Sequence, residues 1–240
     1  MSWVWTDVFS HPLWAVSTVI LGLLLRSQQR GSWDPRACLV QLKGKTAIVT
    51  GANTGLPGDI TSDGLEVSFA TNHVGPFLLT NLLLDLLKRS APARIVNVSS
   101  VNHWRGVVDF SHFKGENLAY TMDSVYNHTK LHNVICTNEL AQRLQGTANS
   151  LHPGVVMTEV MRHYNFLVRF LFNLIGIFFF KSSEEGAVST IYCAVAEETE
   201  GITGKYFDSD CSLVLPAPLA RDPALAVKDF EFCERLTSKL

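Results

Sequence analysis

Lys45-Thr46-Ala47-Ile48-Val49-Thr50 is followed at once by Gly51-Ala52-Asn53-Thr54-Gly55. The first six residues are mostly apolar or β-branched, which predicts a buried strand. The glycines after it allow a tight turn whose backbone can approach phosphate groups closely. A strand that runs into such a turn is typical of a dinucleotide-binding sheet with helices around it. This stretch therefore predicts an α/β fold.

A second apolar run, residues 94–100, ends in Ser99 and Ser100, and Tyr126 and Lys130 follow with the spacing Tyr-x-x-x-Lys. Residues four apart on a helix share a face, so the Lys130 ammonium can lie beside the Tyr126 phenol. A phenol titrates near pH ~10 and needs a neighbouring cation to exchange a proton at neutral pH. Ser100 could hydrogen-bond the oxygen of a substrate while Tyr126 exchanges a proton with it. Because side chains alternate along a strand, Ser99 is expected to be structural.

Two more motifs complete an ordered set. Asn72 lies in Thr71-Asn72-His73-Val74-Gly75, and the chain continues after Tyr126 and Lys130 to Pro153-Gly154-Val155-Val156-Met157-Thr158. From about Gly44 to Phe207, this set resembles the short-chain dehydrogenase/reductase superfamily. The stretches that look most like its retinol dehydrogenase branch are Phe77 to Leu87, Arg94 to Ser100 and His152 to Val156.

The resemblance implies catalytic roles for four residues. A tyrosine in the place of Tyr126 donates or accepts the substrate proton, and a lysine in the place of Lys130 lowers the pKa of that tyrosine and holds the nicotinamide ribose. Ser100 would orient the substrate oxygen. An asparagine placed like Asn72 positions a water that connects the lysine to solvent.

The resemblance also implies a Rossmann-like, mostly parallel sheet with helices on both faces and a nicotinamide cofactor. The cofactor-binding residues that it implies are Gly51, Asn53, Thr54, Gly55, Tyr126, Lys130, Pro153, Gly154, Val156 and Thr158. The segment from Pro153 to Thr158 would cover the nicotinamide end.

The chain departs from the family pattern directly after the glycine turn. The family sequence is Thr-Gly-x-x-x-Gly-x-Gly, and here Pro57 stands in the place of the last glycine. Proline removes a backbone donor and fixes φ. Residues 56–64 read as a loop, and the next helical pattern is Leu65 to Arg89. Each parallel strand needs a crossover of at least ~10 residues, so several strand–helix units do not fit between Thr50 and Arg94.

The chain therefore looks like a family member that lacks a contiguous block at Leu56 to Gly58. An alternative transcript and a gap in a gene model would both produce this pattern. The block would carry the helix under the pyrophosphate and the residue that reads the adenosine ribose. Because that residue separates NAD from NADP, both NADP(H) and NAD(H) stay open, and the retinol dehydrogenase branch mostly favours NADP(H).

Composition excludes several classes of protein. The chain has 240 residues, is 47% hydrophobic and carries a formal net charge of −2, so nucleic acid is not an expected partner. An odd number of cysteines without a Cys-x-x-Cys pair favours reduced thiols in a cytosolic setting. These are Cys38, Cys136, Cys193, Cys211 and Cys233. His128 and His132 are spaced i, i+4, but without a third ligand in the pattern we predict no metal site.

The N-terminal segment predicts a membrane anchor. From Val8 to Leu25 the chain is mostly apolar, and as a helix it would cover about 27 Å, close to the ~30 Å hydrocarbon core of a bilayer. Arg26 and Arg30 follow the apolar run, which places the domain after it in the cytosol. A cleaved signal peptide and a packed soluble helix are the alternatives. The family resemblance implies the endoplasmic reticulum as the membrane.

The expected organisation is an anchor over residues 1–30, a linker over 31–43, a truncated short-chain dehydrogenase/reductase domain over 44–215 and a polar helical tail over 216–240. Within the domain, Phe166 to Phe180 is an aromatic stretch that suits either a lid for a long apolar substrate or a core helix. Glu184 to Glu197 reads as an amphipathic helix and Gly204 to Phe207 as a last strand.

Two hypotheses on function remain open. The first is a membrane-anchored oxidoreductase that interconverts a retinoid or similar lipid alcohol and its carbonyl through Asn72, Ser100, Tyr126 and Lys130. The second is a non-catalytic, cofactor-free remnant that keeps the anchor and half the sheet and acts by binding partners. The retained chemical residues favour the first hypothesis, and the missing nucleotide half favours the second, because hydride transfer requires the nicotinamide within ~3–3.5 Å of the substrate carbon.

Overall fold

The computed structural model describes residues 12–28, 31, 33–51, 59–110, 122–156, 176 and 180–238. At its centre is a four-stranded sheet in the order β1-β2-β3-β4. The strands are β1 (Ala93–Val98), β2 (Gly146–Leu151), β3 (Tyr206–Phe207) and β4 (Leu213–Val214). β1, β2 and β3 run parallel and β4 is antiparallel. The predicted α/β fold with a mostly parallel sheet is confirmed.

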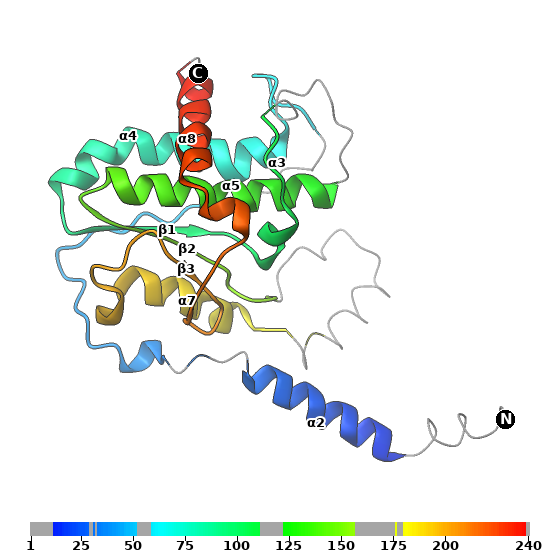
Figure 1. Cartoon of the computed structure of the whole chain (residues 1–240). Helices are drawn as coiled ribbons and strands as arrows, with labels where there is room; N and C mark the ends of the chain where they lie inside the picture. The colour runs from blue at the N-terminus through cyan, green and yellow to red at the C-terminus, as the bar shows by residue number, and fades with distance from the viewer. Residues whose placement is uncertain are drawn as a thin grey trace.

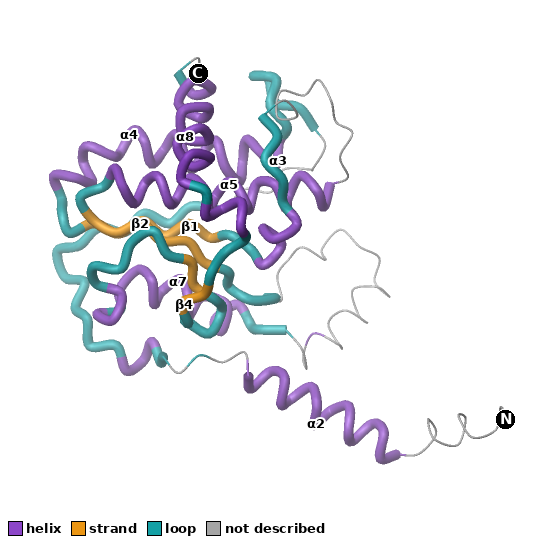
Figure 2. Tube along the Cα trace, viewed as in Figure 1, coloured by secondary structure: helices purple, strands orange, loops and turns teal. Residues whose placement is uncertain are grey.

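Helices cover both faces of this sheet. α4 (Gly75–Arg89), α5 (Met122–Arg143) and α8 (Pro223–Thr237) lie on one face, and α7 (Ser183–Val195) lies on the other (Figures 1 and 2). The predicted helix over Glu184 to Glu197 is thus confirmed as α7. Short helical turns occur at η1 (Pro35–Ala37), η3 (Val101–Arg105), η6 (Glu197–Thr199) and η7 (Pro218–Arg221).

The helix predicted over Leu65 to Arg89 forms in three consecutive pieces. α3 (Val67–Phe69) begins after Glu66, whose carboxylate accepts a hydrogen bond from the Phe69 N–H and caps the helix N-terminus. It continues through η2 (Ala70–Val74), a turn of π-helix, into α4. π-Helical turns often occur at functional sites, and this one contains Asn72.

The core lies mainly between α5, the sheet and α8. Phe77, Leu140, Ala148 and Phe230 belong to one buried cluster on this side of the sheet. Leu151, Cys193 and Phe207 form a second cluster under α7. The residues expected to form a polar tail therefore include a helix, α8, that packs into the main core through a fully buried phenylalanine.

The prediction of a strand over Lys45 to Thr50 is wrong. These residues have no strand pairing, and Ile48 and Val49 are 64% and 92% exposed. An isolated extended segment leaves its backbone groups and its apolar side chains to water, so a strand forms only against a neighbouring strand. In the described part of the chain no strand other than β2 lies beside β1, and the apolar segment has no sheet partner.

β1 is consequently an edge strand. Its register with β2 shows which of its backbone N–H and C=O groups have no partner strand. The Ser99 N–H donates to the Leu151 carbonyl at 2.7 Å. In a parallel ladder both backbone groups of one residue point to the same neighbour, and those of the next residue point away. The N–H and C=O groups of Arg94, Val96 and Val98 therefore face away from β2. Across the described ranges, no backbone group pairs with them.

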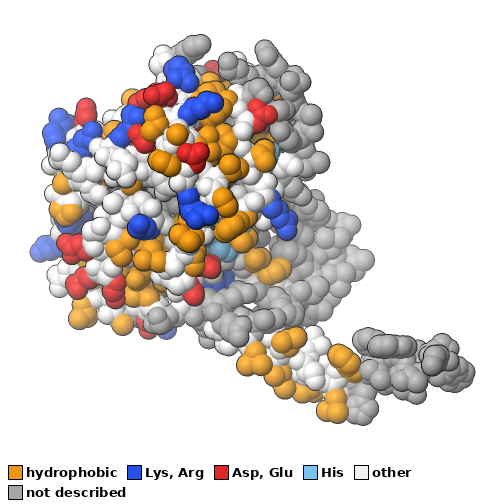
Figure 3. Space-filling view, viewed as in Figure 1, with side chains coloured by type: hydrophobic (Ala, Val, Ile, Leu, Met, Phe, Trp, Pro, Cys, Tyr) orange, Lys and Arg blue, Asp and Glu red, His pale blue; other side chains and the backbone are white. Residues whose placement is uncertain are grey.

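The N-terminal helix α2 (Pro12–Gln28) stands apart from the sheet and its helices (Figure 1). Figure 3 shows apolar side chains along this helix. Leu13, Ile20 and Leu24 are all more than half exposed. The predicted span began at Val8, which lies outside the described residues. None of the helices in the described ranges combines the length and the apolar character that crossing a membrane requires.

Candidate functional site

The Ser100 hydroxyl and the Tyr126 phenol meet at the carboxyl end of β1. Ser100 is the N-cap of η3, and its Oγ accepts the N–H of Asn102 at 3.2 Å. Its side chain also lowers the pKa of Tyr126, near the start of α5, as a hydrogen-bonding neighbour of the phenol. Residues predicted to act on one substrate oxygen are thus brought together from positions 26 apart in the sequence.

Ser99 has the structural role expected of it. Its side chain is buried, and its hydroxyl donates to the backbone carbonyl of Lys130 at 2.7 Å. This bond ties the end of β1 to the helix that carries Tyr126. Both serines follow the last residue of β1, and Ser99 is the more buried of the two.

Lys130 lies beside the Tyr126 ring, but burial and Ser100 are the influences that act on the pKa of Tyr126 in the structure. Burial raises the pKa of Tyr126, and the hydrogen bond from Ser100 opposes that rise. The Lys130 ammonium lies 5.4 Å from the centroid of the Tyr126 ring and donates to the Val98 carbonyl at 3.0 Å. Burial also lowers the pKa of Lys130 to about 8. A lysine held by a carbonyl oxygen contributes less to stabilising a phenolate than one that points at the hydroxyl.

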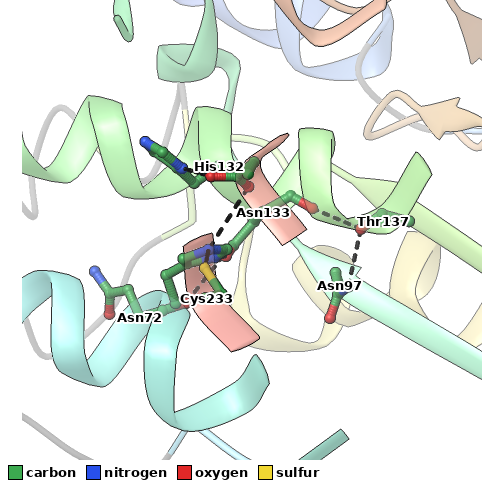
Figure 4. A network of polar contacts seen from close by, with 8 residues as sticks. Asn72, Asn97, His132, Asn133, Thr137 and Cys233 are labelled. Atoms are coloured by element: carbon green, nitrogen blue, oxygen red, sulfur yellow. Dashed lines mark hydrogen bonds and ion pairs between the residues drawn. The ribbon is translucent and has the colours of Figure 1, made fainter. Parts of the chain in front are cut away.

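Asn72 lies within the π-helical turn η2 and contacts α5. Its side-chain amide donates to the Thr129 hydroxyl at 3.4 Å, and its backbone carbonyl accepts from the Asn133 amide at 3.1 Å. Figure 4 shows this as part of a polar network that continues through Thr137 to Asn97 of β1. Asn72 therefore contacts Thr129, the residue that precedes Lys130 in α5. The network fixes η2 to α5 and β1.

The turn that starts at Pro153 follows β2, so it lies at the same end of the sheet as Ser100. Gly154 has φ +93°, which favours glycine, and its N–H donates to the His152 imidazole at 3.2 Å. The backbone of Lys181 donates to the Val155 carbonyl at 2.8 Å, and its ammonium donates to the Ser209 carbonyl at 2.5 Å. Lys181, which the sequence analysis did not single out, holds this turn in place. No pattern in the sequence marks it.

The predicted nucleotide turn is only partly visible. Gly51 has φ +109°, and a Cβ placed there would meet no atom within 4 Å. Asn53, Thr54 and Gly55, and Thr158 in the later motif, lie outside the described residues. The segment that leads into the turn is exposed and unpaired. The described residues therefore fit the reactive end of a nicotinamide cofactor, but they build no strand-supported turn for its pyrophosphate.

These groups can donate a proton to a bound oxygen. With a raised pKa, Tyr126 stays protonated at neutral pH, and a phenol that already bonds a serine hydroxyl is positioned beside a second donor. This state suits protonation of a carbonyl oxygen during reduction. Removal of a proton from an alcohol would require the phenolate, which this environment disfavours.

Comparison with known proteins places the chain in a family. It is 45% identical over 185 residues to retinol dehydrogenase 14 of Homo sapiens, covering 75% of this chain and 54% of that protein. It is 47% identical over 169 residues to retinol dehydrogenase 12 of Homo sapiens, covering 69% and 52%. The chain thus spans about half the length of the curated relatives it matches. No family model matches it.

Among solved structures, an uncharacterised protein from Mycobacterium Paratuberculosis has the same fold with a TM-score of 0.58 at 26% identity, over 76% of this chain and 63% of that one. The shared fold and the close sequence match to the retinol dehydrogenases agree with the motifs found along the chain. The chain therefore belongs to the short-chain dehydrogenase/reductase superfamily, in its retinol dehydrogenase-like branch.

Proposed function

We propose that this protein is an oxidoreductase that interconverts a retinoid or similar lipid alcohol and its aldehyde or ketone. The observation that carries the proposal is that Ser100, Tyr126 and Lys130 gather at the carboxyl end of β1, with the Lys130 ammonium 5.4 Å from the centroid of the Tyr126 ring and Ser100 lowering the pKa of Tyr126. Ser100 holds the substrate oxygen and Tyr126 exchanges the proton with it. Lys130 supplies positive charge next to the phenol, and Asn72 fixes η2 to the helix that carries both.

A nicotinamide cofactor, NADP(H) or NAD(H), supplies or accepts the hydride when bound. On this chain the described residues proposed to hold it are Gly51, Tyr126, Lys130, Pro153, Gly154 and Val156. The left-handed conformation of Gly154 and the Lys181 bonds fix the turn after β2 next to the end of β1, which supports this assignment. Asn53, Thr54, Gly55 and Thr158 complete the proposed set by resemblance.

The proposed substrate class follows from the relatives, whose names identify them as retinol dehydrogenases. An apolar substrate of this kind partitions into membranes. The exposed apolar side chains of α2 support attachment of the protein to a bilayer surface or core through this helix. Arg26 and Arg30 after the apolar run favour a cytosolic domain, and the branch suggests the endoplasmic reticulum.

The proposal is tested with purified full-length protein. Wild type should change the fluorescence of reduced nicotinamide on binding and should turn over all-trans-retinal. Tyr126→Phe should abolish turnover and keep binding, because it removes only the exchangeable proton. Tyr192→Phe is the matched control, since Tyr192 packs against Trp33 and Phe207 away from Ser100. If the wild-type protein does not bind the dinucleotide at millimolar concentration, the proposal that it is an enzyme is refuted.

A second candidate function is supported by the bare edge of β1. A non-catalytic remnant that binds partners would use this edge, because unpaired strand groups accept another strand. The Lys130 ammonium, which the resemblance assigns to the cofactor, is already bonded to the Val98 carbonyl on that edge. This geometry favours a chain that no longer holds a cofactor.

Two proline variants test the second candidate. The Val96 N–H faces away from β2, whereas the Ile95 N–H faces it. Val96→Pro should keep the fold and reduce concentration-dependent association measured by light scattering, because it removes one donor from the bare edge. Ile95→Pro should unfold the protein. A wild type that stays monomeric at every concentration, with no partner strand bound, argues against this candidate.

A further inference from the structure

Metal-ligating side chains gather in the core, away from Ser100 and Tyr126. His73 comes from η2, His132 and Cys136 are one turn apart on α5, and Asp229 and Cys233 are one turn apart on α8. All of them are buried. Such spacings put each helical pair on a single face. Figure 4 shows His132 and Cys233 close together around the polar network that contains Asn133.

The separations among the donor atoms suit one small ion. His73 Nε2, Asp229 Oδ2 and Cys233 Sγ all lie within 4.8 Å of one another. The Nε2–Sγ distance is 3.2 Å and the Nε2–Oδ2 distance is 3.9 Å. Ligands held at about 2.0–2.3 Å around a tetrahedral Zn²⁺ are about 3.3–3.8 Å apart. The cluster therefore has nearly the dimensions of a zinc site.

The neighbours of His73 orient it as a metal ligand. The Asn133 amide nitrogen donates to the Asn72 carbonyl, so its oxygen faces His73 Nδ1 at 2.9 Å and accepts the proton of that nitrogen. The lone pair of Nε2 then points toward Cys233 and Asp229. Metal-bound histidines are commonly fixed by such a second hydrogen bond.

Asp229 gives a second, independent sign of a missing ligand. Its Oδ1 is 2.5 Å from His132 Nδ1, while its Oδ2 is fully buried without a hydrogen-bond partner. A buried carboxylate oxygen without a partner is costly. A hydrogen bond from the Cys233 thiol to His73 would satisfy those two residues and still leave this oxygen unsatisfied.

We propose that His73, Asp229 and Cys233 bind one Zn²⁺ ion, and that the thiol of Cys136, which lies outside this group of donor atoms, turns toward the ion as the fourth ligand. Imidazole and thiolate donors select zinc over Mg²⁺ or Ca²⁺. Cys136 and Cys233 belong to the same buried cluster of the core, which places the Cys136 thiol near the proposed site. Zinc binding displaces the thiol protons of both cysteines. Because every ligand is buried, the site is structural and joins η2, α5 and α8.

The test uses the full-length protein after treatment with a chelator. Titration with Co²⁺ should show one equivalent bound, with sulfur-to-cobalt charge transfer and the strong visible bands of a tetrahedral site, and Zn²⁺ should bleach both. Cys233→Ser should remove the charge-transfer band that its thiolate supplies and weaken binding. Cys193→Ser is the matched control, because Cys193 is equally buried but belongs to α7, on the other face of the sheet. Asn133→Ala should weaken binding about 10- to 100-fold.

Thermal unfolding gives a second readout. Zn²⁺ should raise the Tm of chelator-treated wild type and of Cys193→Ser, because a ligand that binds only the folded state stabilises it. It should leave the Tm of Cys233→Ser unchanged. The proposal is overturned if the wild-type protein shows no charge-transfer band, or if its Tm does not respond to Zn²⁺. The buried side chains would then be held by hydrogen bonds alone. The proposal is also overturned if Asn133→Ala binds Co²⁺ as tightly as the wild type does. This second variant keeps the test valid if Cys233→Ser does not fold.

Discussion

The Lys130 ammonium donates a 3.0 Å hydrogen bond to the carbonyl oxygen of Val98, the last residue of β1. That carbonyl faces away from β2, toward the side on which β1 has no neighbouring strand in the described ranges. An unpaired carbonyl at a sheet edge gains from any nearby donor. The unpaired edge of β1 thus holds the ammonium that also lies beside the Tyr126 ring.

Lys130 should make stability depend on alkaline pH. Its pKa falls from 10.5 to about 8 on folding, so between these values the unfolded chain holds a proton that the folded chain has lost. The free energy of unfolding should therefore rise with pH over this range, by about 2 kcal/mol after allowance for partial exposure. The difference between wild type and Lys130→Met in urea unfolding at several pH values isolates this contribution. A difference that is independent of pH would contradict the assignment.

Ser100→Ala should raise the pKa of Tyr126 further. The serine hydroxyl stabilises the phenolate, and its removal leaves only the effect of burial. The measurement is phenolate absorbance during alkaline titration, with the signal of Tyr126 obtained by subtracting Ser100→Ala/Tyr126→Phe. Ser99→Ala is the control, because Ser99 bonds the Lys130 carbonyl and not the phenol. An unchanged titration in Ser100→Ala would show that the two side chains are not bonded in solution.

Gly154→Ala should destabilise the protein more than Gly201→Ala. Both glycines have a positive φ, +93° and +70°, so each substitution carries a backbone cost of about 1–2 kcal/mol. Only at Gly154 would the new methyl meet a side chain, at 2.9 Å from the Lys181 Cδ, whereas Gly201 has open space. Chemical denaturation of both variants measures the difference. Equal losses would mean that Lys181 does not pack on this turn.

Phe230→Ala should cost about 3–5 kcal/mol, because it leaves a large cavity in a fully buried position of α8. Val227→Ala on the same helix serves as the control, since Val227 is 39% exposed, and it should change stability by less than about 1 kcal/mol. Thermal or urea unfolding followed by circular dichroism compares the two. A small effect at Phe230 would restore the interpretation of residues 216–240 as a separate tail.

Local patterns in the sequence predicted much of the fold because they depend on neighbouring residues. Apolar residues between turn formers predicted β1, and the helical pattern predicted α4 and α7. The Tyr-x-x-x-Lys spacing brought Lys130 to the ring of Tyr126. The prediction of a strand at Lys45 to Thr50 failed for a non-local reason, since strand formation depends on a neighbouring strand and the described residues place none beside this segment.

The sequence by itself determined the family and the helices and strands with strong periodicity, and it supplied the residues proposed to exchange a proton with a substrate. Only the tertiary structure decided where the Lys130 ammonium points, that Lys181 holds the turn after β2, and that α8 belongs to the core. It also brought His73 of η2 within reach of Asp229 and Cys233 of α8, close enough to hold one ion. Contacts between residues up to 160 positions apart depend on how the helices pack, which no local pattern encodes.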